Sequence, residues 1–210
     1  MLKKDELKVL KLLFDDLTRS LTISDISRIW KQKYFQTYRT ISSLQKIKLI
    51  EIQSIGNSKI VKLNLSKSNP EYLVAELSRT KDKCKNKTIS IIKNQIEQLN
   101  KNFICILFGS YAVNKQKKSS DIDLLFVIPD QYELASFEKL VKIKLSPYNC
   151  DINITTETGL IEMWQHPKKL TVGTELLKKH LVLYGGEHFL NLLRYRDVGW
   201  KRDRKKHKNY

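Results

Sequence analysis

The sequence predicts an α+β protein in two parts, and three patterns carry this prediction. Apolar residues recur at three- and four-residue spacing through residues 3–48, residues 49–65 alternate as strands do, and residues 103–155 hold three short apolar runs with a helical pattern among them. The first two patterns predict a small N-terminal domain, and the third predicts a short mixed sheet flanked by helices. We expect an N-terminal domain at 1–66, a helical linker at 67–84, a second domain at 85–192 and a basic tail at 193–210.

The N-terminal part is expected to contain three helices and a hairpin. The first helix covers residues 3–19, the second starts after Thr22 as N-cap with Asp25 in its first turn, and the third runs through residues 36–48. Gly56 and Asn57 lie between two alternating segments and predict the hairpin turn. The side chains expected to face the core are Leu7, Leu10, Leu13, Phe14, Leu17, Ile26, Ile29, Trp30, Ile41, Leu44 and Ile47.

The second part begins where Asn69 can cap a helix with Pro70 at its first position. A helical stripe through residues 89–101 follows. Strands are then expected at 103–108, 122–128 and 149–155, with a helix at 132–145 between the last two. The remainder is expected to be mostly helical.

The charge balance favours a polyanionic partner. Thirty-nine Lys and Arg residues against 22 Asp and Glu residues give a formal net charge of +17. Such an excess promotes binding to nucleic acid, although a lysine-rich solvated surface would give the same count. The C-terminal "KRDRKKHK" is accordingly either a nucleic-acid-binding tail or a solubilising end.

Composition also bears on the compartment. No apolar run approaches the roughly 20 residues of a membrane helix, and the N-terminus carries acidic residues where a signal peptide would be apolar. The three cysteines Cys84, Cys105 and Cys150 are an odd and sparse set, which favours a reducing environment. We therefore expect a cytoplasmic protein with no membrane association.

Two aspartates suggest a metal site. Asp121 and Asp123 are two residues apart at the start of an expected strand, so both carboxylates point to the same face. Carboxylates this close repel each other unless a cation lies between them, and Mg²⁺ prefers oxygen ligands. Asp151 lies in a later strand on the face opposite to Ile152 and Ile154, and joins the pair if the two strands are neighbours.

Gly109 and Ser110 suggest a phosphate site. They follow the strand at 103–108, where glycine lets the backbone approach a ligand and free N–H groups can bind phosphate oxygens. A Gly-Ser turn alone is common, and Ser-Asp-x-Asp alone is often only a strand-entry turn. Together with Asp151, they favour phosphoryl or nucleotidyl transfer assisted by two metal ions.

The segment "GSYAVNKQKKSSDIDLL", with "CDINI" further on, resembles the signature of the DNA-polymerase-β-like nucleotidyltransferases, closest to the minimal nucleotidyltransferases. The resemblance covers roughly residues 85–190 and implies transfer of a nucleoside monophosphate from a triphosphate, with ATP favoured and Mg²⁺ as cofactor. It implies that Gly109 and Ser110 hold the triphosphate, that Asp121 and Asp123 bind metal, and that Asp151 completes the metal site and helps deprotonate the acceptor. Small members usually have Arg-Gly where Val113-Asn114 stands here, so lysines such as Lys117 and Lys118 would have to bind phosphate instead.

The N-terminal part resembles winged helix-turn-helix domains, most clearly in "TISDISRIWKQKYFQTYRTISSLQKIKLIEI". In such domains the third helix enters the major groove, and pairs of domains often read two half-sites, so a homodimer is one possible assembly. Arg39 and Gln36 could contact base edges, while Lys46 and Lys59 would meet phosphate. The full set of expected DNA-binding residues is Gln36, Thr37, Tyr38, Arg39, Ser42, Ser43, Lys46 and Lys59. A role in dimer or protein contacts is the alternative.

Three functions remain open from the sequence. The first is a nucleotidyltransferase whose winged helix binds nucleic acid, DNA being favoured over RNA, and whose acceptor is a protein such as a toxin, a nucleic-acid end or a small alcohol. The second is a DNA-binding regulator whose degenerate nucleotidyltransferase domain only senses nucleotide. The third is an RNA-modifying transferase.

Overall fold

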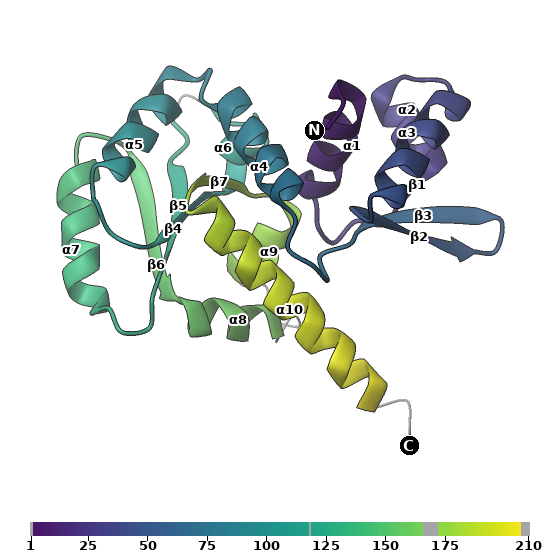
Figure 1. The fold of residues 1–210 in the computed structure, drawn as a ribbon. Helices are drawn as coiled ribbons and strands as arrows, with labels where there is room; N and C mark the ends of the chain where they lie inside the picture. The colour runs from purple at the N-terminus through teal and green to yellow at the C-terminus, as the bar shows by residue number, and fades with distance from the viewer. Residues whose placement is uncertain (1, 118, 166–171, 207–210) are drawn as a thin grey trace.

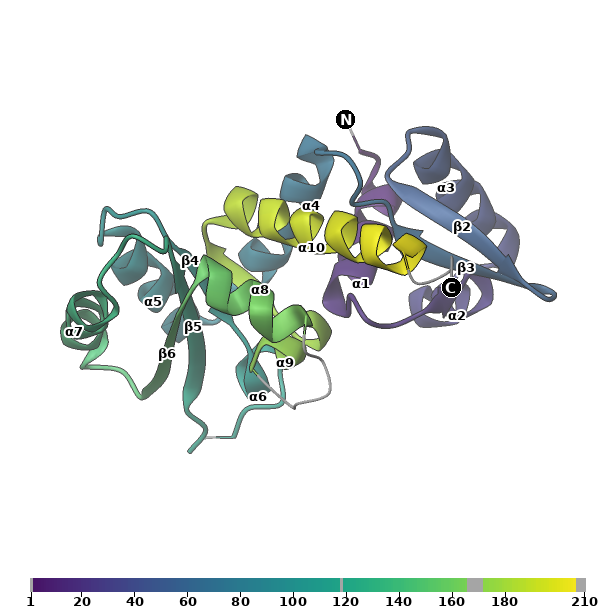
Figure 2. The same cartoon turned by 90° about the horizontal axis from the view of Figure 1, so that it is seen from below.

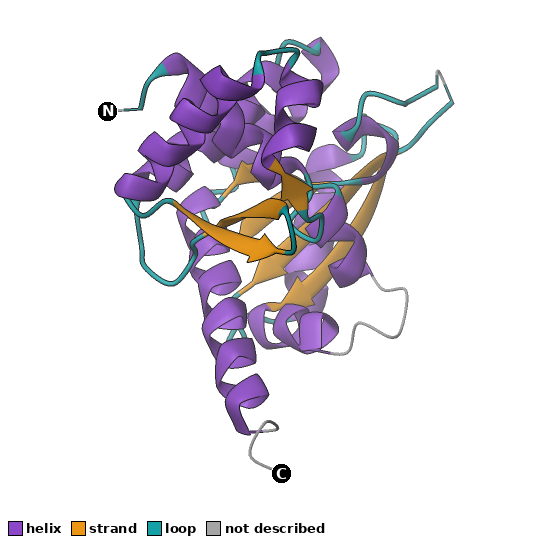
Figure 3. Ribbon diagram, turned by 90° about the vertical axis from the view of Figure 1, so that its right-hand side faces the viewer, coloured by secondary structure: helices purple, strands orange, loops and turns teal. Residues whose placement is uncertain are grey.

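The computed structural model describes residues 2–117, 119–165 and 172–206, with side chains described as far as Arg196, and confirms the α+β class. The N-terminal unit contains α1 (Lys4–Asp15), β1 (Leu21–Thr22), α2 (Ile23–Trp30), α3 (Tyr34–Lys46), β2 (Ile50–Ile55) and β3 (Ser58–Leu63). Its strands form an antiparallel sheet in the order β1-β3-β2. Figure 1 shows α1, α2 and α3 on one side of this sheet, and Figure 3 shows its strands together with those of the second sheet.

Local sequence explains these elements. Thr22 caps α2 by accepting the backbone N–H of Asp25 at 3.1 Å, and the Asp25 carboxylate accepts the Thr22 backbone N–H in return. Gly56 has a φ of 55°, the left-handed conformation that the turn between β2 and β3 requires. The sequence did not indicate β1, because a strand of two residues is too short to show alternation.

Two expected core residues of this unit are instead exposed. Ile29 lies in the last turn of α2, which ends at Lys31 in the left-handed conformation, and its side chain is 43% exposed. Ile47 is the residue after α3 and is 50% exposed, because the helical periodicity that would turn it inward has already ended. Helical spacing thus fails at the ends of short helices.

The remainder of the chain forms a second, four-stranded sheet with helices on both faces. Its elements are α4 (Pro70–Lys83), α5 (Lys87–Glu97), β4 (Ile104–Leu107), α6 (Gly109–Ala112), β5 (Ile122–Ile128), α7 (Leu134–Leu145), β6 (Cys150–Thr156), α8 (Glu157–Gln165), α9 (Val172–Lys178), β7 (Leu181–Tyr184) and α10 (Gly186–Lys206). The strand order is β6-β5-β4-β7, with β5 and β6 parallel and the other pairs antiparallel. The sequence analysis placed β7 in a helical region, since four apolar residues do not distinguish a strand from a buried helical turn.

Alternation along β4 and β5 supplies both faces of this sheet. Leu124 and Phe126 pack with α5 and α7, whereas Leu125 and Val127 pack with α8, α9 and α10 on the other side. Figure 2 shows α5 and α7 on one side of the strands and α8, α9 and α10 on the other. Asp123 precedes Leu125 by two residues, so its side chain points to the same face, the one covered by α8, α9 and α10. It lies at the end of the sheet where β4 ends.

Helix α4 packs against both units. It lies between α1 and β7 (Figure 1), and its buried Ala75 belongs to a core that also contains Phe14 of α1 and Leu125 of β5. The Leu17 N–H also donates to the carbonyl of Leu177 in α9 at 2.8 Å. Residues 67–84, expected as a helical linker, therefore include α4, which packs into the shared core.

Helix α10 continues past residue 193, where we placed the start of the tail, and Leu193 is fully buried against the shared core. None of the helices among the described residues combines the length and the apolar composition that crossing a membrane requires.

Candidate functional site

Strand register brings the aspartates together. In the parallel pair of β5 and β6, Asp123 lies directly opposite Asp151. Asp121 precedes Asp123 by two residues, so it lies toward the same face at the entry to β5. The three carboxylates expected from the sequence therefore gather at one end of the sheet, and this depends on β6 being the parallel neighbour of β5.

Side-chain amides hold two of the carboxylates. Asn149 donates to Asp121 Oδ1 at 2.5 Å, and Asn153 donates to Asp151 Oδ2 at 3.2 Å. Asp121 and Asp151 are exposed, whereas Asp123 is half-buried. Among the described side chains, no three His, Cys, Asp or Glu residues are arranged as a ready-made metal site.

The environment of Asp123 is strongly acidic. Burial raises the pKa of its carboxyl group, and the negative charges of Asp151, Glu175 and Asp121 raise it further. Glu175, an exposed residue of α9, was not predicted, because no sequence spacing relates it to the aspartates. Three carboxylates thus act on Asp123, and an added positive charge would relieve their repulsion.

Gly109 lies in close contact with the Asp123 side chain. It has a φ of 62° and begins α6, and a side-chain Cβ at this position would overlap Asp123 Oδ2. The backbone is tied to the same residue, because the Phe108 N–H donates to the Asp123 carbonyl at 3.0 Å. The Gly-Ser turn and the aspartates therefore form one site, and the glycine is required both by conformation and by space.

Replacing Gly109 with Ala is expected to destabilise the protein by about 2–5 kcal/mol. Left-handed backbone costs an alanine about 1–2 kcal/mol, and overpacking against Asp123 adds about 1–3 kcal/mol. Gly56→Ala is the matched control, since Gly56 has a similar φ of 55° with no atom within 4 Å of an added Cβ. Urea denaturation of both variants isolates the contact with Asp123, and equal losses would show that this contact is absent.

The lysines expected to bind phosphate, Lys117 and Lys118, fall between α6 and β5 in the sequence. Lys117 is exposed, and its backbone N–H donates to Ser120 Oγ at 2.9 Å in a turn. Lys118 lies outside the described residues. A different lysine, Lys83 at the end of α4, is buried and donates to Asn114 Oδ1 at 2.5 Å, just after α6. No local pattern indicates this contact, because 31 residues separate the two partners.

A second candidate surface lies on α3. Tyr38, Arg39, Gln36 and Lys46, which we expect to contact DNA, are exposed along the helix. Lys59 of β3 lies over the Tyr38 ring, 5.1 Å from its centroid, so the hairpin adds its charge to this face. The Arg39 guanidinium lies over the ring of Phe35, an exposed aromatic residue that was not among the expected contacts.

The remaining α3 candidates are less available. Thr37 is a correction: its side chain is fully buried on the face that packs inward with Ile41, so it cannot contact a ligand. Ser43 is partly buried and donates to Glu6 Oε1 at 2.7 Å, and Ser42 is partly buried.

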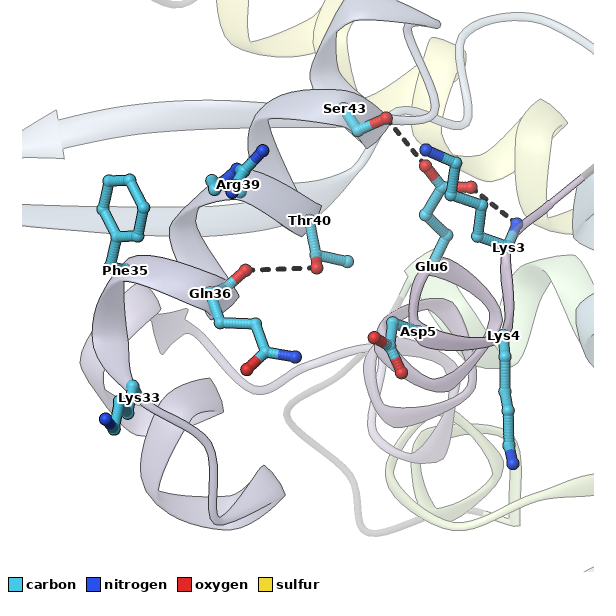
Figure 4. A pocket seen from close by; sticks show the side chains of 10 residues that line it. All are labelled: Lys3, Lys4, Asp5, Glu6, Lys33, Phe35, Gln36, Arg39, Thr40 and Ser43. Atoms are coloured by element: carbon cyan, nitrogen blue, oxygen red, sulfur yellow. Dashed lines mark hydrogen bonds between the residues drawn. The ribbon is translucent and has the colours of Figure 1, made fainter.

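A groove of about 930 Å³ lies between α1 and α3 (Figure 4). Phe35, Gln36 and Arg39 line it from α3. Lys3 and Lys4 line the opposite side at the beginning of α1, together with Asp5 and Glu6. The groove extends the basic face of α3, but two acidic residues lie along it.

Comparisons with known proteins agree with the class suggested by the site. Residues 89–180, which contain Gly109, Ser110 and all three aspartates, match the family model described as a nucleotidyltransferase domain. This match supports a nucleotidyltransferase enzyme.

A solved structure described as "Crystal structure of the toxin-antitoxin with AMP-PNP" is similar to 56% of this chain and 92% of that chain, at 17% identity and a TM-score of 0.38. No curated protein matches the chain.

Proposed function

We propose that the protein is a Mg²⁺-dependent nucleotidyltransferase that transfers a nucleoside monophosphate from a triphosphate, with ATP favoured, to a hydroxyl group. One observation carries the proposal. Asp123 lies opposite Asp151 and against the Gly109 turn, inside a segment that matches the nucleotidyltransferase domain.

The donor set fits a divalent cation. The raised pKa of Asp123, caused by its burial and by three neighbouring carboxylates, reflects excess negative charge that Mg²⁺ would neutralise. Asp121, Asp123 and Asp151 would hold the metal, exchanging the amide contacts of Asn149 and Asn153 for metal–oxygen contacts. When bound, Mg²⁺ would neutralise charge on the phosphates and on the leaving pyrophosphate.

The protein groups would have distinct roles in transfer. Gly109 and Ser110 would bring backbone close to the triphosphate. The acceptor oxygen would form a bond to the α-phosphorus as the bond to pyrophosphate breaks, and the Asp151 carboxylate would take the acceptor proton. Asp151 suits this role because it is exposed beside Asp123.

Titration calorimetry with Mg-ATP tests the site. The wild-type protein is compared with the double variant that carries both Asp121→Asn and Asp123→Asn. We expect binding that requires Mg²⁺ and is lost in the variant. Label from the α-phosphate should then pass to an acceptor. Binding without transfer would favour the regulator that senses nucleotide, and absence of binding with every triphosphate would contradict the proposal.

We propose further that the N-terminal unit is a winged helix-turn-helix domain that binds DNA. The order of its helices and strands supports this, because α2 and α3 precede a hairpin whose strands pair with the short β1. The exposed Arg39, Gln36 and Lys46 on α3, with Lys59 of the hairpin beside Tyr38, form a basic face of the kind that meets a phosphate backbone.

The double variant Arg39→Ala and Lys46→Ala is expected to bind DNA about tenfold or more weakly. The slope of log K against log salt concentration should become shallower by about 1–2. Fluorescence anisotropy with a labelled duplex at several salt concentrations measures both effects. Lys139→Ala on α7 is the control, since it removes one exposed lysine from the other unit. An equal loss in the control would mean that binding reflects net charge alone, and the double variant should retain Mg-ATP binding.

A further inference from the structure

Lys83 carries a buried positive charge with little compensation. The residue is 8% exposed, and its pKa is lowered by burial. Among the side chains that the structure describes, its hydrogen-bond partner is the neutral amide oxygen of Asn114, at 2.5 Å, and no carboxylate lies within ion-pair distance. A buried ammonium group is costly unless an anion approaches it.

The partner of Lys83 belongs to the loop that follows the Gly-Ser turn. Asn114 has a φ of 57°, and the next residue, Lys115, donates its N–H to the Ser110 carbonyl at 3.0 Å. This contact folds the loop back on α6. The ammonium group of Lys83 is therefore held at the far end of the same short helix whose first residue, Gly109, touches Asp123.

Opposite uncompensated charges thus flank α6. At its start lies the half-buried Asp123 with excess negative charge, and at its end lies the buried ammonium of Lys83. Four helical residues rise about 6 Å, so one polyphosphate chain can contact both ends. A metal-bound triphosphate carries the two charges that are missing, a cation for the aspartates and an anionic tail for the lysine.

We infer that Lys83 is a phosphate-binding residue of the nucleotide site, donating to a non-bridging oxygen of the β- or γ-phosphate, with Asn114 positioning its ammonium group. The inference rests on the proposed function. It differs from the sequence expectation, which assigned this task to lysines of the loop itself. It also gives α4, which packs against α1, a direct role in the catalytic domain.

Calorimetric titration with Mg-ATP, Mg-ADP and Mg-AMP tests the inference. We expect Lys83→Met to raise the Kd for ATP and ADP at least tenfold and to change the Kd for AMP less than twofold, because only the first two have the phosphates concerned. Lys139→Ala, which removes an exposed lysine of α7, is the control and should change each Kd less than twofold. Equal effects of Lys83→Met on all three nucleotides, or none on any, would overturn the assignment.

A second variant keeps the lysine and supplies an internal anion. Asn114→Asp would pair with Lys83 and compete with phosphate, so we expect a higher Tm together with weaker ATP binding. Unchanged ATP affinity in this variant would also overturn the inference. If the wild-type protein binds no nucleotide, the proposed function fails together with the role of Lys83. If the wild-type protein binds ATP and both variants bind it with the same affinity, only the role of Lys83 fails.

Discussion

Asp123→Asn is expected to reduce nucleotidyl transfer on the order of 1,000-fold while making the nucleotide-free protein more stable. Activity falls because charge neutralisation by a metal contributes several kcal/mol to such reactions, and the amide is a poor metal ligand. Stability rises because the raised pKa of Asp123 shows that its charged form is disfavoured in the folded protein. Like charges opposed on neighbouring strands cost about 0.2–1 kcal/mol, which corresponds to about 0.4–4 °C in Tm.

The pH dependence has a definite sign. A carboxyl group whose folded pKa is raised destabilises the protein above that pKa, and the penalty disappears as pH falls below the ordinary value of 3.8. The Tm gain of Asp123→Asn should therefore be largest near neutral pH and vanish toward pH ~3.8. Scanning calorimetry without Mg²⁺ measures it, and transfer of α-phosphate label from ATP measures activity.

Asp130 provides the control from just beyond the other end of β5. Its pKa is lowered by hydrogen bonds from Thr156 and Thr158, so its charge stabilises the folded protein above pH 3.8. Asp130→Asn should therefore lower Tm slightly and leave transfer intact. A fall in Tm for Asp123→Asn, or retained transfer, would contradict the metal-site assignment.

The largest effect on stability is expected from Arg79→Ala, which should lower the free energy of unfolding by about 3–5 kcal/mol. Arg79 is 5% exposed and donates to Glu76 Oε1 at 2.6 Å, to the His180 carbonyl at 2.7 Å and to Asp15 Oδ1 at 3.0 Å. Burial opposes the charge on Glu76, but Arg79 and His180 outweigh it and lower its pKa. Without Arg79, Glu76 becomes a buried charge with little compensation, and the ion pair between Arg79 of α4 and Asp15 of α1 is lost.

Urea denaturation checks this prediction, with Arg28→Ala as control. Arg28 forms an ion pair with Asp25 at 3.5 Å but is 80% exposed, so its removal should cost no more than about 1 kcal/mol. Replacing both Glu76 and Arg79 with Leu should recover part of the loss, since no buried charge is then left alone. Losses of similar size for Arg79→Ala and Arg28→Ala would show that the buried network contributes little.

The predictable parts of this structure were those with a strong local signal. Short apolar runs located β4 and β5, and the pair Asn69 and Pro70 located the start of α4. The spacing of Asp121 and Asp123 identified a carboxylate pair on one face. The sequence did not predict β1 and β7 as strands, because they are too short to show alternation. Helical spacing wrongly placed Ile29 and Ile47 in the core, because they lie where their helices end.

Lys83 and Glu175 show why the rest of the site was not predictable. Each approaches the Gly-Ser and aspartate segment from an element distant in sequence, Lys83 from α4 and Glu175 from α9. Their place depends on how helices pack on the sheet, which no local pattern encodes. The same holds for Thr37, whose burial is set by the packing of α3 on the core.

By itself the sequence determined the chemistry of this protein: the acidic pair, the Gly-Ser turn and the excess of basic residues, because residue type and local spacing fix charge and strand face. The tertiary structure alone decided which charges meet. Pairing of β5 with β6 set Asp123 against Asp151, and packing of α4 between the two units buried Arg79 and Lys83. Such contacts join residues tens of positions apart, and only the folded core holds them together.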